Sequence, residues 1–395
     1  MEGSAAMKVS QRASSVAGSA TLTLATRAKE MAASGLDVVS MAVGEPDFST
    51  PELVREAVRT SVTKGRVRYT PAAGTTSLRA ALASTAGSSR GIELTPSQVV
   101  VTHSCKHALN LVLAAVVEPG DEVLLLEPVW GSYDAAVSWS GARAVRVASR
   151  PDLGPDLEAI AAAARTAKGV MLNSPTNPSG YVWTDEELRG LLAIAEEHDL
   201  WIISDEIYRR LSYGDKQATS PLSLGESARE RILAVDGASK SLAMTGFRIG
   251  CVFGPEAVVK AIANVQSETT GCPNALSQAG WEAALLEEPP EVDGWVSSFK
   301  ARRDLLVSGL RDLGMECAMP GGAFYAFPSV APFLDERGSA GFCDDLLESE
   351  QLVIVPGAVF GMDDHVRLSY ALGEPQLQEA LQRLGRFLDG RRAQG

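Results

Sequence analysis

The sequence predicts an α/β protein with a large domain built around a mainly parallel sheet and a smaller α+β domain. In the middle of the chain, short runs that are apolar along their whole length alternate with stretches of helical periodicity. Strands of this kind are typical of a parallel sheet that is covered by helices on both faces. From about residue 295 the order of helices and strands becomes mixed, which indicates a separate domain.

The central elements follow one another along the chain. Five strands are predicted, at SQVVVT (97–102), DEVLLLEP (121–128), KGVMLNSP (168–175), LWIISDE (200–206) and RILAVDGASK (231–240). Residues 106–118 carry apolar side chains at helical spacing. A further helix is predicted over 184–199, because Thr184 as N-cap and Glu187 three residues later form a capping-box pattern.

The C-terminal part predicts a different arrangement. A helix is expected over 299–314 and another over 374–390, where apolar residues recur every three or four positions. Between them, strands are expected at GAFYAFP (322–328), EQLVIVPG (350–357) and HVRLSYA (365–371).

Composition narrows the possible functions. The net charge of −13 argues against a nucleic-acid partner and favours small-molecule substrates. The five cysteines include no C-x-x-C pair, which favours a reducing cytoplasm. No signal peptide or membrane span is expected from the N-terminus or the apolar runs. The spacing of His103, Cys105 and His107 hints at a metal, but no further ligand cluster accompanies it, so no metal is predicted.

Polar clusters follow all five predicted central strands. They are THSCK, EPVWGSY, NSPTNPSG, SDEIY and GASK. In open α/β sheets, ligands bind beyond the carboxyl ends of the strands. We therefore expect the five clusters to line one crevice.

Lys240 and Asp205 are the main candidates for chemistry. A lysine amine reacts with aldehydes once it has lost its proton, and burial or a nearby cation such as Arg248 lowers its pKa. Asp205 ends an apolar strand, and a buried carboxylate needs a partner such as a protonated pyridine nitrogen. The alternatives are a surface lysine in a Ser/Gly loop and an aspartate that caps a helix.

Several further residues fit a flat, phosphorylated cofactor. Tyr208 and Asn177 could hydrogen-bond its phenolate oxygen, although Asn-Pro is also a turn signal. Trp130 could stack on its ring, although core packing is the commoner fate of a tryptophan. The first N–H groups of the helix that follows THS would bind the phosphate.

Together these residues resemble the fold-type I pyridoxal-phosphate enzymes, specifically the class I/II aminotransferases of the aspartate aminotransferase family. The resemblance extends from about Val9 to the C-terminal helix. Its motifs are VGEPDFSTP (43–51), YTPAAGTTSLR (69–79), NSPTNPSG (173–180), SDEIY (204–208), SKSLAMTGFRIG (239–250), PGGAFY (320–325) and HVRLSYA (365–371).

The resemblance implies the pyridoxal-phosphate transferase fold, with a mostly parallel seven-stranded sheet. The large domain would span 51–294, and residues 1–50 and 295–395 would form the small α+β domain. It also implies an aminotransferase of amino acid metabolism that moves an amino group between an amino acid and a 2-oxo acid in two half-reactions. A homodimer with shared active sites is expected.

The resemblance also implies roles at the cofactor. Lys240 would be the Schiff-base lysine and proton shuttle, and Asp205 the partner of the pyridinium nitrogen. Tyr208 and Asn177 would bind the phenolate oxygen, and Trp130 would stack on the ring.

Other matched positions concern the phosphate. Arg248 corresponds to the phosphate-binding arginine, and Tyr69 to a tyrosine that reaches the phosphate of the neighbouring subunit. The helix start would add the residues Ser104, Cys105 and Lys106.

On the substrate side, the resemblance implies that Arg367 clamps the α-carboxylate and that the backbone of Gly44 faces the substrate. Lys106 and Thr21 favour a dicarboxylic partner such as aspartate, glutamate or prephenate, although Lys106 could instead be a solvated lysine at a helix start. The expected substrate-binding set is Arg367, Gly44, Asn177, Trp130, Lys106 and Thr21.

Some positions depart from the commonest pattern. Ser104 and Cys105 stand where relatives often have glycines, and the segments 268–278 and 127–133 also differ. Such changes around an intact cofactor set would suit a lyase or a β- or γ-replacement enzyme, for example one acting on S-adenosylmethionine. A non-catalytic regulator that binds a small effector is another alternative, but the retained Lys240, Asp205 and Arg248 argue against it.

Overall fold

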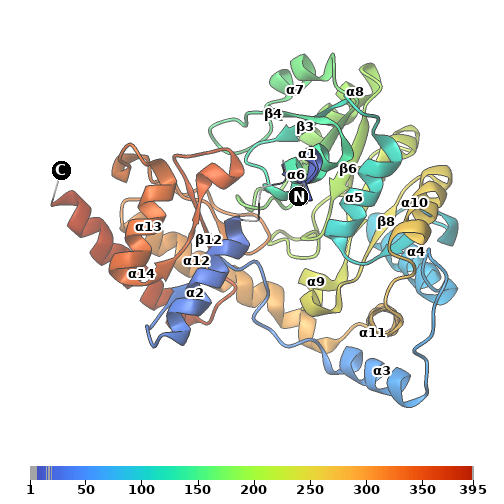
Figure 1. The fold of residues 1–395 in the computed structure, drawn as a ribbon, viewed down its shortest axis with the longest axis horizontal. Coiled ribbons are helices and arrows are strands. Elements are labelled where there is room, and N and C mark those ends of the chain that lie inside the picture. The colour runs from blue at the N-terminus through green and yellow to red at the C-terminus, as the bar shows by residue number, and fades with distance from the viewer. Residues whose placement is uncertain (1–6, 15, 17, 19, 394–395) are drawn as a thin grey trace, which may run out of the picture.

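The computed structural model describes residues 7–14, 16, 18 and 20–393. Its core is a seven-stranded sheet in the order β2-β8-β7-β6-β5-β3-β4, in which only β8 runs antiparallel to its neighbours (Figure 1). The strands are β2 (Val99–Thr102), β3 (Glu122–Leu126), β4 (Arg143–Val147), β5 (Gly169–Asn173), β6 (Trp201–Asp205), β7 (Ile232–Asp236) and β8 (Gly250–Phe253). The mostly parallel seven-stranded sheet is thus confirmed.

Two of the seven strands were not predicted individually. β4 lies at the edge of the sheet and carries two exposed arginines, Arg143 and Arg146, so it lacks the continuous apolar run of its neighbours. β8 is only four residues long and directly follows the polar segment around Arg248, so the sequence pattern did not show it as a separate strand.

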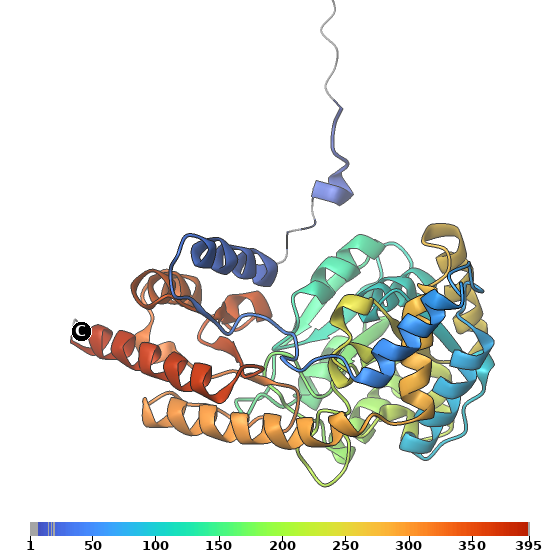
Figure 2. The same ribbon diagram turned by 90° about the horizontal axis from the view of Figure 1, so that it is seen from below.

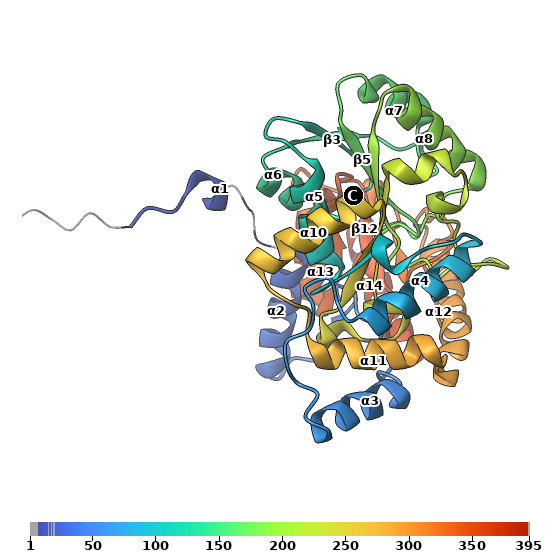
Figure 3. The ribbon, with the colours of Figure 1, turned by 90° about the vertical axis from the view of Figure 1, so that its right-hand side faces the viewer.

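Helices cover both faces of this sheet, as Figure 3 shows. Alternate strand residues pack into two separate apolar cores, with Val100 and Leu125 in one and Val101 and Leu124 in the other. The helices of this part are α3 (Glu52–Thr63), α4 (Thr76–Arg90), α5 (Cys105–Val116), α6 (Ser132–Ser140), α7 (Leu157–Ala164), α8 (Asp185–Glu197), α9 (Ala238–Ser241), α10 (Glu256–Thr269) and α11 (Ala275–Leu286).

The predicted capping box of α8 is confirmed. Thr184 Oγ1 accepts a hydrogen bond from the backbone N–H of Glu187 at 3.2 Å, and Glu187 Oε2 accepts one from the N–H of Thr184 at 2.9 Å. Two donors at the helix start are satisfied in this way, which fixes where α8 begins.

The N-terminal and C-terminal parts of the chain pack together beside the large sheet (Figure 2). β1 (Val39–Ser40) pairs with β10 (Leu352–Val353), and β11 (Val355–Pro356), β12 (Val366–Ser369) and β9 (Tyr325–Ala326) form a three-stranded antiparallel sheet. The helices here are α2 (Ala20–Ala33), α12 (Asp293–Asp312), α13 (Gly338–Glu350) and α14 (Glu374–Arg392), whereas the short α1 (Gln11–Ser14) lies apart from them and contacts α6. The domain boundaries at 50/51 and 294/295 stay a prediction.

Short 3₁₀ segments connect many of these elements. They are Pro96–Gln98, Pro221–Ser223, Ser227–Arg231, Thr245–Phe247, Pro290–Val292, Ala331–Phe333 and Gly357–Phe360. Among the helices in the described part of the chain, none has the length and apolar composition needed to cross a membrane.

A buried ionic cluster lies just behind the carboxyl ends of β6 and β7. Arg90, whose side chain is 1% exposed, donates through Nη2 to Glu206 Oε2 at 2.6 Å and to Asp236 Oδ2 at 3.3 Å. Glu206 Oε1 also accepts a hydrogen bond from Ser220 Oγ at 2.5 Å. Since buried charges are tolerated only when paired, this cluster ties α4 to the strand ends.

We expect Glu206→Gln to destabilise the protein by about 3–5 kcal/mol, because it leaves the buried Arg90 charge without its main counter-charge. The measurement is urea unfolding followed by circular dichroism. The matched control is Asp344→Asn, which breaks the exposed ion pair with Arg27, whose side chains are 42% and 55% exposed. That change should cost less than about 1 kcal/mol. Equal effects of the two substitutions would contradict the assignment.

Candidate active site

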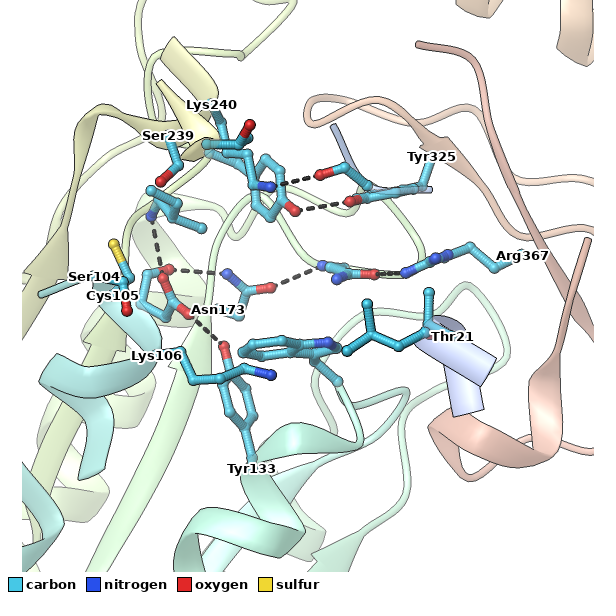
Figure 4. Close-up of a pocket in the computed structure, with 18 of the residues that line it drawn as sticks. Thr21, Ser104, Cys105, Lys106, Tyr133, Asn173, Ser239, Lys240, Tyr325 and Arg367 are labelled. Carbon is cyan, nitrogen blue, oxygen red and sulfur yellow. Dashed lines mark hydrogen bonds between the residues drawn. The ribbon is translucent and has the colours of Figure 1, made fainter. Parts of the chain in front are cut away.

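A cavity of about 360 Å³ opens at the carboxyl ends of the central strands, where these meet the small sheets (Figure 4). The five polar clusters predicted at the strand ends all contribute to its lining, so the expected crevice is confirmed. The predicted site residues that line it are Thr21, Gly44, Ser104, Cys105, Lys106, Trp130, Asn177, Asp205, Tyr208, Lys240, Arg248 and Arg367. Their individual roles stay predictions.

Tyr69 is the predicted site residue that lies outside the cavity. Its side chain is 98% exposed, on the loop between α3 and α4. A side chain that is this exposed makes no contact with the cavity of its own chain. Its role at the phosphate of a neighbouring subunit stays a prediction.

Lys240 lies in the short helix α9, directly after β7, and its side chain points into the cavity (Figure 4). Nζ donates a hydrogen bond to the carbonyl oxygen of Gly44 at 2.5 Å. Burial lowers the pKa of Lys240 to about 8, and the nearby Arg367 and Arg248 charges act in the same direction. A substantial fraction of this amine is therefore neutral at mild pH, which a nucleophile or base requires.

Asp205 ends β6 and is 4% exposed. Its Oδ2 accepts a hydrogen bond from Tyr133 Oη at 2.8 Å, and its Oδ1 accepts one from the N–H of Ile207 at 3.2 Å. Burial raises the pKa of Asp205 to about 6, and the nearby Asp236 and Glu206 charges add to the rise. No cationic side chain of the described residues forms an ion pair with it.

Tyr133 was missed by the sequence analysis, which singled out only Trp130 in this segment. Tyr133 is the second residue of α6, and its side chain is buried, with 2% of the residue exposed. A tyrosine three residues after a stacking tryptophan was the available signal. Without the fold, nothing indicated that its hydroxyl reaches the end of β6.

A chain of hydrogen bonds crosses the floor of the cavity. Asn173 Nδ2 donates to the carbonyl oxygen of Asp205 at 2.9 Å, and Asn173 Oδ1 accepts from the N–H of Asn177 at 2.8 Å. Asn177 Oδ1 in turn accepts from Arg367 Nη1 at 3.0 Å. Asn173, which was not predicted, thus links the carboxylate end of the cavity to the arginine end (Figure 4).

Arg367 comes from β12 in the small sheet and is 2% exposed. Besides Asn177, its guanidinium donates through Nη2 to the carbonyl oxygen of Ala42 at 2.6 Å. Its Nε has no hydrogen-bond partner among the described residues. A buried guanidinium that lines a cavity is suited to an anionic ligand.

Tyr208 lines the same cavity as Asn177, and its predicted role at the phenolate oxygen stays a prediction. Its hydroxyl is hydrogen-bonded to Tyr325 Oη at 2.8 Å, and both side chains are buried. Tyr325 was not predicted as a site residue. It also closes the space above Gly44, because any Cβ atom at Gly44 would overlap Tyr325 Oη.

The start of α5 forms a pocket for an anion. Ser104 is the N-cap with a φ of 154°, a backbone conformation usual for glycine, and its Oγ accepts from the N–H of His107 at 3.2 Å. The N–H groups of Cys105 and Lys106 belong to the first turn, which has no helical acceptors for them. Arg248 lines the same cavity. Helix start and arginine together suit a phosphate.

Lys106 and Trp130 form a further wall. Lys106 Nζ lies 4.8 Å from the centre of the Trp130 ring, a cation–π distance. Partial burial lowers the pKa of Lys106, and the Arg248 charge contributes. Thr21 of α2 faces the same cavity.

The hinted metal site lacks a ligand cluster. The rings of His103 and His107 lie 5.3 Å apart, but the described residues contain no group of three side chains able to hold a metal ion. Burial lowers the pKa of His107 to about 4.

The cavity fits pyridoxal phosphate in three respects that the structure itself shows. It holds an amine with a lowered pKa at Lys240 and a buried carboxylate at Asp205 that is paired with no cationic side chain of the described residues. It also has a helix start with Arg248 beside it for the phosphate. An aldehyde, a pyridine nitrogen and a phosphate would each find a complementary group.

In the cofactor-free protein we expect Lys240 to react with an aldehyde and a reducing agent with a midpoint near pH 8. The pKa is lowered, so the reactive neutral amine is populated above about pH 8, whereas an ordinary lysine needs a pH near 10.4. Peptide mapping by mass spectrometry at a series of pH values measures the modified fraction. A short lysine peptide is the control, and a midpoint at or above about pH 10 would contradict the expectation.

Comparison with known proteins supports the same reading. The family model described as "Aminotransferase class I and II" matches residues 36–384. The chain is 39% identical over 388 residues to the probable aspartate/prephenate aminotransferase of Thermus aquaticus, covering 96% of this chain and 99% of that protein. It is 36% identical over 394 residues to the aspartate aminotransferase of Bacillus subtilis, with 97% and 99% covered.

A solved structure shows the same fold. The aspartate aminotransferase from Thermus thermophilus with maleate superimposes with a TM-score of 0.91 at 38% identity, and the match covers 96% of this chain and all of that one. The match spans both the large sheet and the small sheets. The chain belongs to the class I and II aminotransferases, enzymes that depend on pyridoxal phosphate.

Proposed function

We propose that this aminotransferase acts on a dicarboxylic substrate such as aspartate, glutamate or prephenate, and passes the amino group to a 2-oxo acid. The observation that carries the proposal is a cavity with cationic side chains from two elements, Arg367 of β12 and Lys106 of α5. The names of the Thermus relatives, which include aspartate and prephenate, support it. They also favour amino transfer over elimination or replacement.

Each end of such a substrate has a suitable partner. The guanidinium of Arg367 would bind the α-carboxylate through its planar fork, and Asn177 holds that fork in place. Lys106, steadied by Trp130, would meet the distal carboxylate together with Thr21. A carboxylate at each end would be matched by a cation, which discriminates against neutral amino acids.

Lys240 is placed to move protons. When bound, pyridoxal phosphate supplies an aldehyde that takes up the amino group and a ring that withdraws electrons from the substrate Cα. The neutral Nζ of Lys240 would take the proton from Cα, and the Gly44 carbonyl orients this amine. Asp205 would hold a proton on the ring nitrogen, and Tyr133 keeps the carboxylate turned toward the cavity.

Assembly and location belong to the same proposal. Tyr69 and Val67 are 98% and 57% exposed on one loop, which suits burial against a second copy in a homodimer with shared sites. All five cysteines are free thiols, which suits a cytoplasmic protein. The proposed domains remain 51–294 for the cofactor-binding part and 1–50 with 295–395 for the small part.

Replacing Lys240 with alanine should lower turnover at least about 10⁴-fold, because it removes the covalent anchor and the acid–base group together. The measurement combines 2-oxo acid release with the visible absorbance of the bound cofactor. Exogenous methylamine should restore part of the activity, because it supplies a small amine at the same place. Undiminished turnover in the alanine variant would show that another group is the base.

Lys106→Met should lower kcat/KM for aspartate and glutamate about 10- to 100-fold, because it removes a charged hydrogen bond to the distal carboxylate. The value for alanine as amino donor should stay within about twofold. Steady-state kinetics with all three donors measure the ratio. Lys260→Met is the control, because Lys260 is an exposed lysine of α10 outside the cavity. A uniform loss with all donors would instead assign Lys106 to the cofactor phosphate.

A further inference from the structure

Tyr325 is in contact with Tyr208 and Arg367 and closes the space above Gly44. We propose that Tyr325 is a positioning residue with two separable contributions: its hydroxyl aims the proton of Tyr208 into the cavity, and its ring holds Arg367. The proposal rests on the proposed function, in which Arg367 binds the substrate carboxylate, and on the predicted role of Tyr208 at the phenolate oxygen of the cofactor.

The hydroxyl pair joins two distant parts of the chain. Tyr208 follows β6 of the large sheet, and Tyr325 belongs to β9 of the small sheet. The two side chains are 4% and 1% exposed, and their Oη atoms lie 2.8 Å apart (Figure 4). Water therefore has little access to either hydroxyl.

The direction of this hydrogen bond follows from the available acceptors. A tyrosine hydroxyl has one proton to donate and can also accept. Among the described residues, Tyr208 Oη is the one hydrogen-bond partner of Tyr325 Oη, and Gly44 closes the remaining side. When the cavity holds a phenolate oxygen, Tyr208 can donate to it only if Tyr325 donates to Tyr208. Two hydroxyls in line strengthen each other in a dry site.

The ring of Tyr325 acts on a different neighbour. The guanidinium carbon of Arg367 lies 4.5 Å from its centre, within cation–π range. Asn177 and the Ala42 carbonyl hold the two Nη atoms of Arg367, but its Nε has no hydrogen-bond partner among the described residues. The Phe360 ring lies 5.1 Å from the same carbon, so the Tyr325 ring is the nearer of two rings that hold the plane of the guanidinium.

The chain offers a matched pair for comparison. Tyr213 and Tyr370 also form a buried hydroxyl pair, with Oη atoms 3.2 Å apart, and neither lines the cavity. Tyr370→Phe removes a hydroxyl of the same kind from the same region of the small sheet. A purely structural role for Tyr325 would give Tyr325→Phe and Tyr370→Phe the same consequences.

The experiment compares wild type, Tyr325→Phe, Tyr325→Leu and Tyr370→Phe. The first readout is the pH midpoint of the visible absorbance of the bound cofactor. A donated hydrogen bond stabilises the phenolate form that prevails at high pH, so a weaker bond should raise the midpoint by about 0.5 pH unit in Tyr325→Phe. The dissociation constant of pyridoxal phosphate, measured with the apoenzyme, should rise about threefold. Tyr370→Phe should change neither.

The second readout separates the ring from the hydroxyl. Tyr325→Phe keeps the ring, so the KM for the amino donor should remain within about twofold of wild type. Tyr325→Leu removes the ring and should raise that KM about tenfold, with a smaller change in kcat. Thermal unfolding of all variants reports whether they are folded.

Two results would overturn the proposal. One is a pH midpoint and a cofactor dissociation constant in Tyr325→Phe equal to those of Tyr370→Phe. The other is an unchanged KM in a folded Tyr325→Leu variant. Both refer to a wild type that binds the cofactor and transaminates, whereas failure of the proposed function would appear as wild-type protein without turnover on dicarboxylic donors.

Discussion

Burial of the Lys240 amine and the Asp205 carboxylate in one cavity is the constraint on which the site depends. Asp205 is the last residue of β6 and Lys240 follows the neighbouring parallel strand β7, so their side chains emerge at the same edge of the sheet. Burial moves the two pKa values toward each other, to about 8 and about 6, by penalising both charges. Each group is thereby left ready for a ligand: an aldehyde for the amine and a protonated ring nitrogen for the carboxylate.

The two acidic residues nearest to Asp205 in the fold, Glu206 and Asp236, form ion pairs outside the cavity. Glu206, next in the chain after Asp205, points away from the cavity and pairs with the buried Arg90. Asp236 at the end of β7 shares the same arginine. This division follows from strand geometry, in which successive side chains face opposite directions. Although the chain carries a net charge of −13, three basic side chains besides Lys240 line the cavity: Arg248, Lys106 and Arg367.

The site is complete only where the two parts of the molecule meet. The large sheet supplies the amine, the carboxylate and the helix start of α5, whereas the N-terminal segment and the small sheet supply Gly44, Tyr325 and Arg367. The hydrogen bonds that cross this junction include those from Lys240 to Gly44, between Tyr208 and Tyr325, and from Arg367 to Asn177. Substrate recognition and cofactor chemistry are therefore coupled through the packing of the two parts.

Five of the seven central strands and the candidate cofactor residues could be predicted from local patterns in the sequence. Apolar runs ending in polar clusters marked five of the seven central strands, and the residue types at Lys240, Asp205 and Arg248 fitted one chemistry. The edge strand β4 was not predicted because it has no continuous apolar run, and β8 was not predicted because it is only four residues long and directly follows the polar segment around Arg248. Tyr133, Asn173 and Tyr325 were not predicted for another reason. Each matters through a hydrogen bond, and the partners of these bonds lie between 4 and 117 positions away in the sequence. Local sequence records which groups a segment carries, but hydrogen-bond partners are set by packing between segments, and so only the folded chain reveals them.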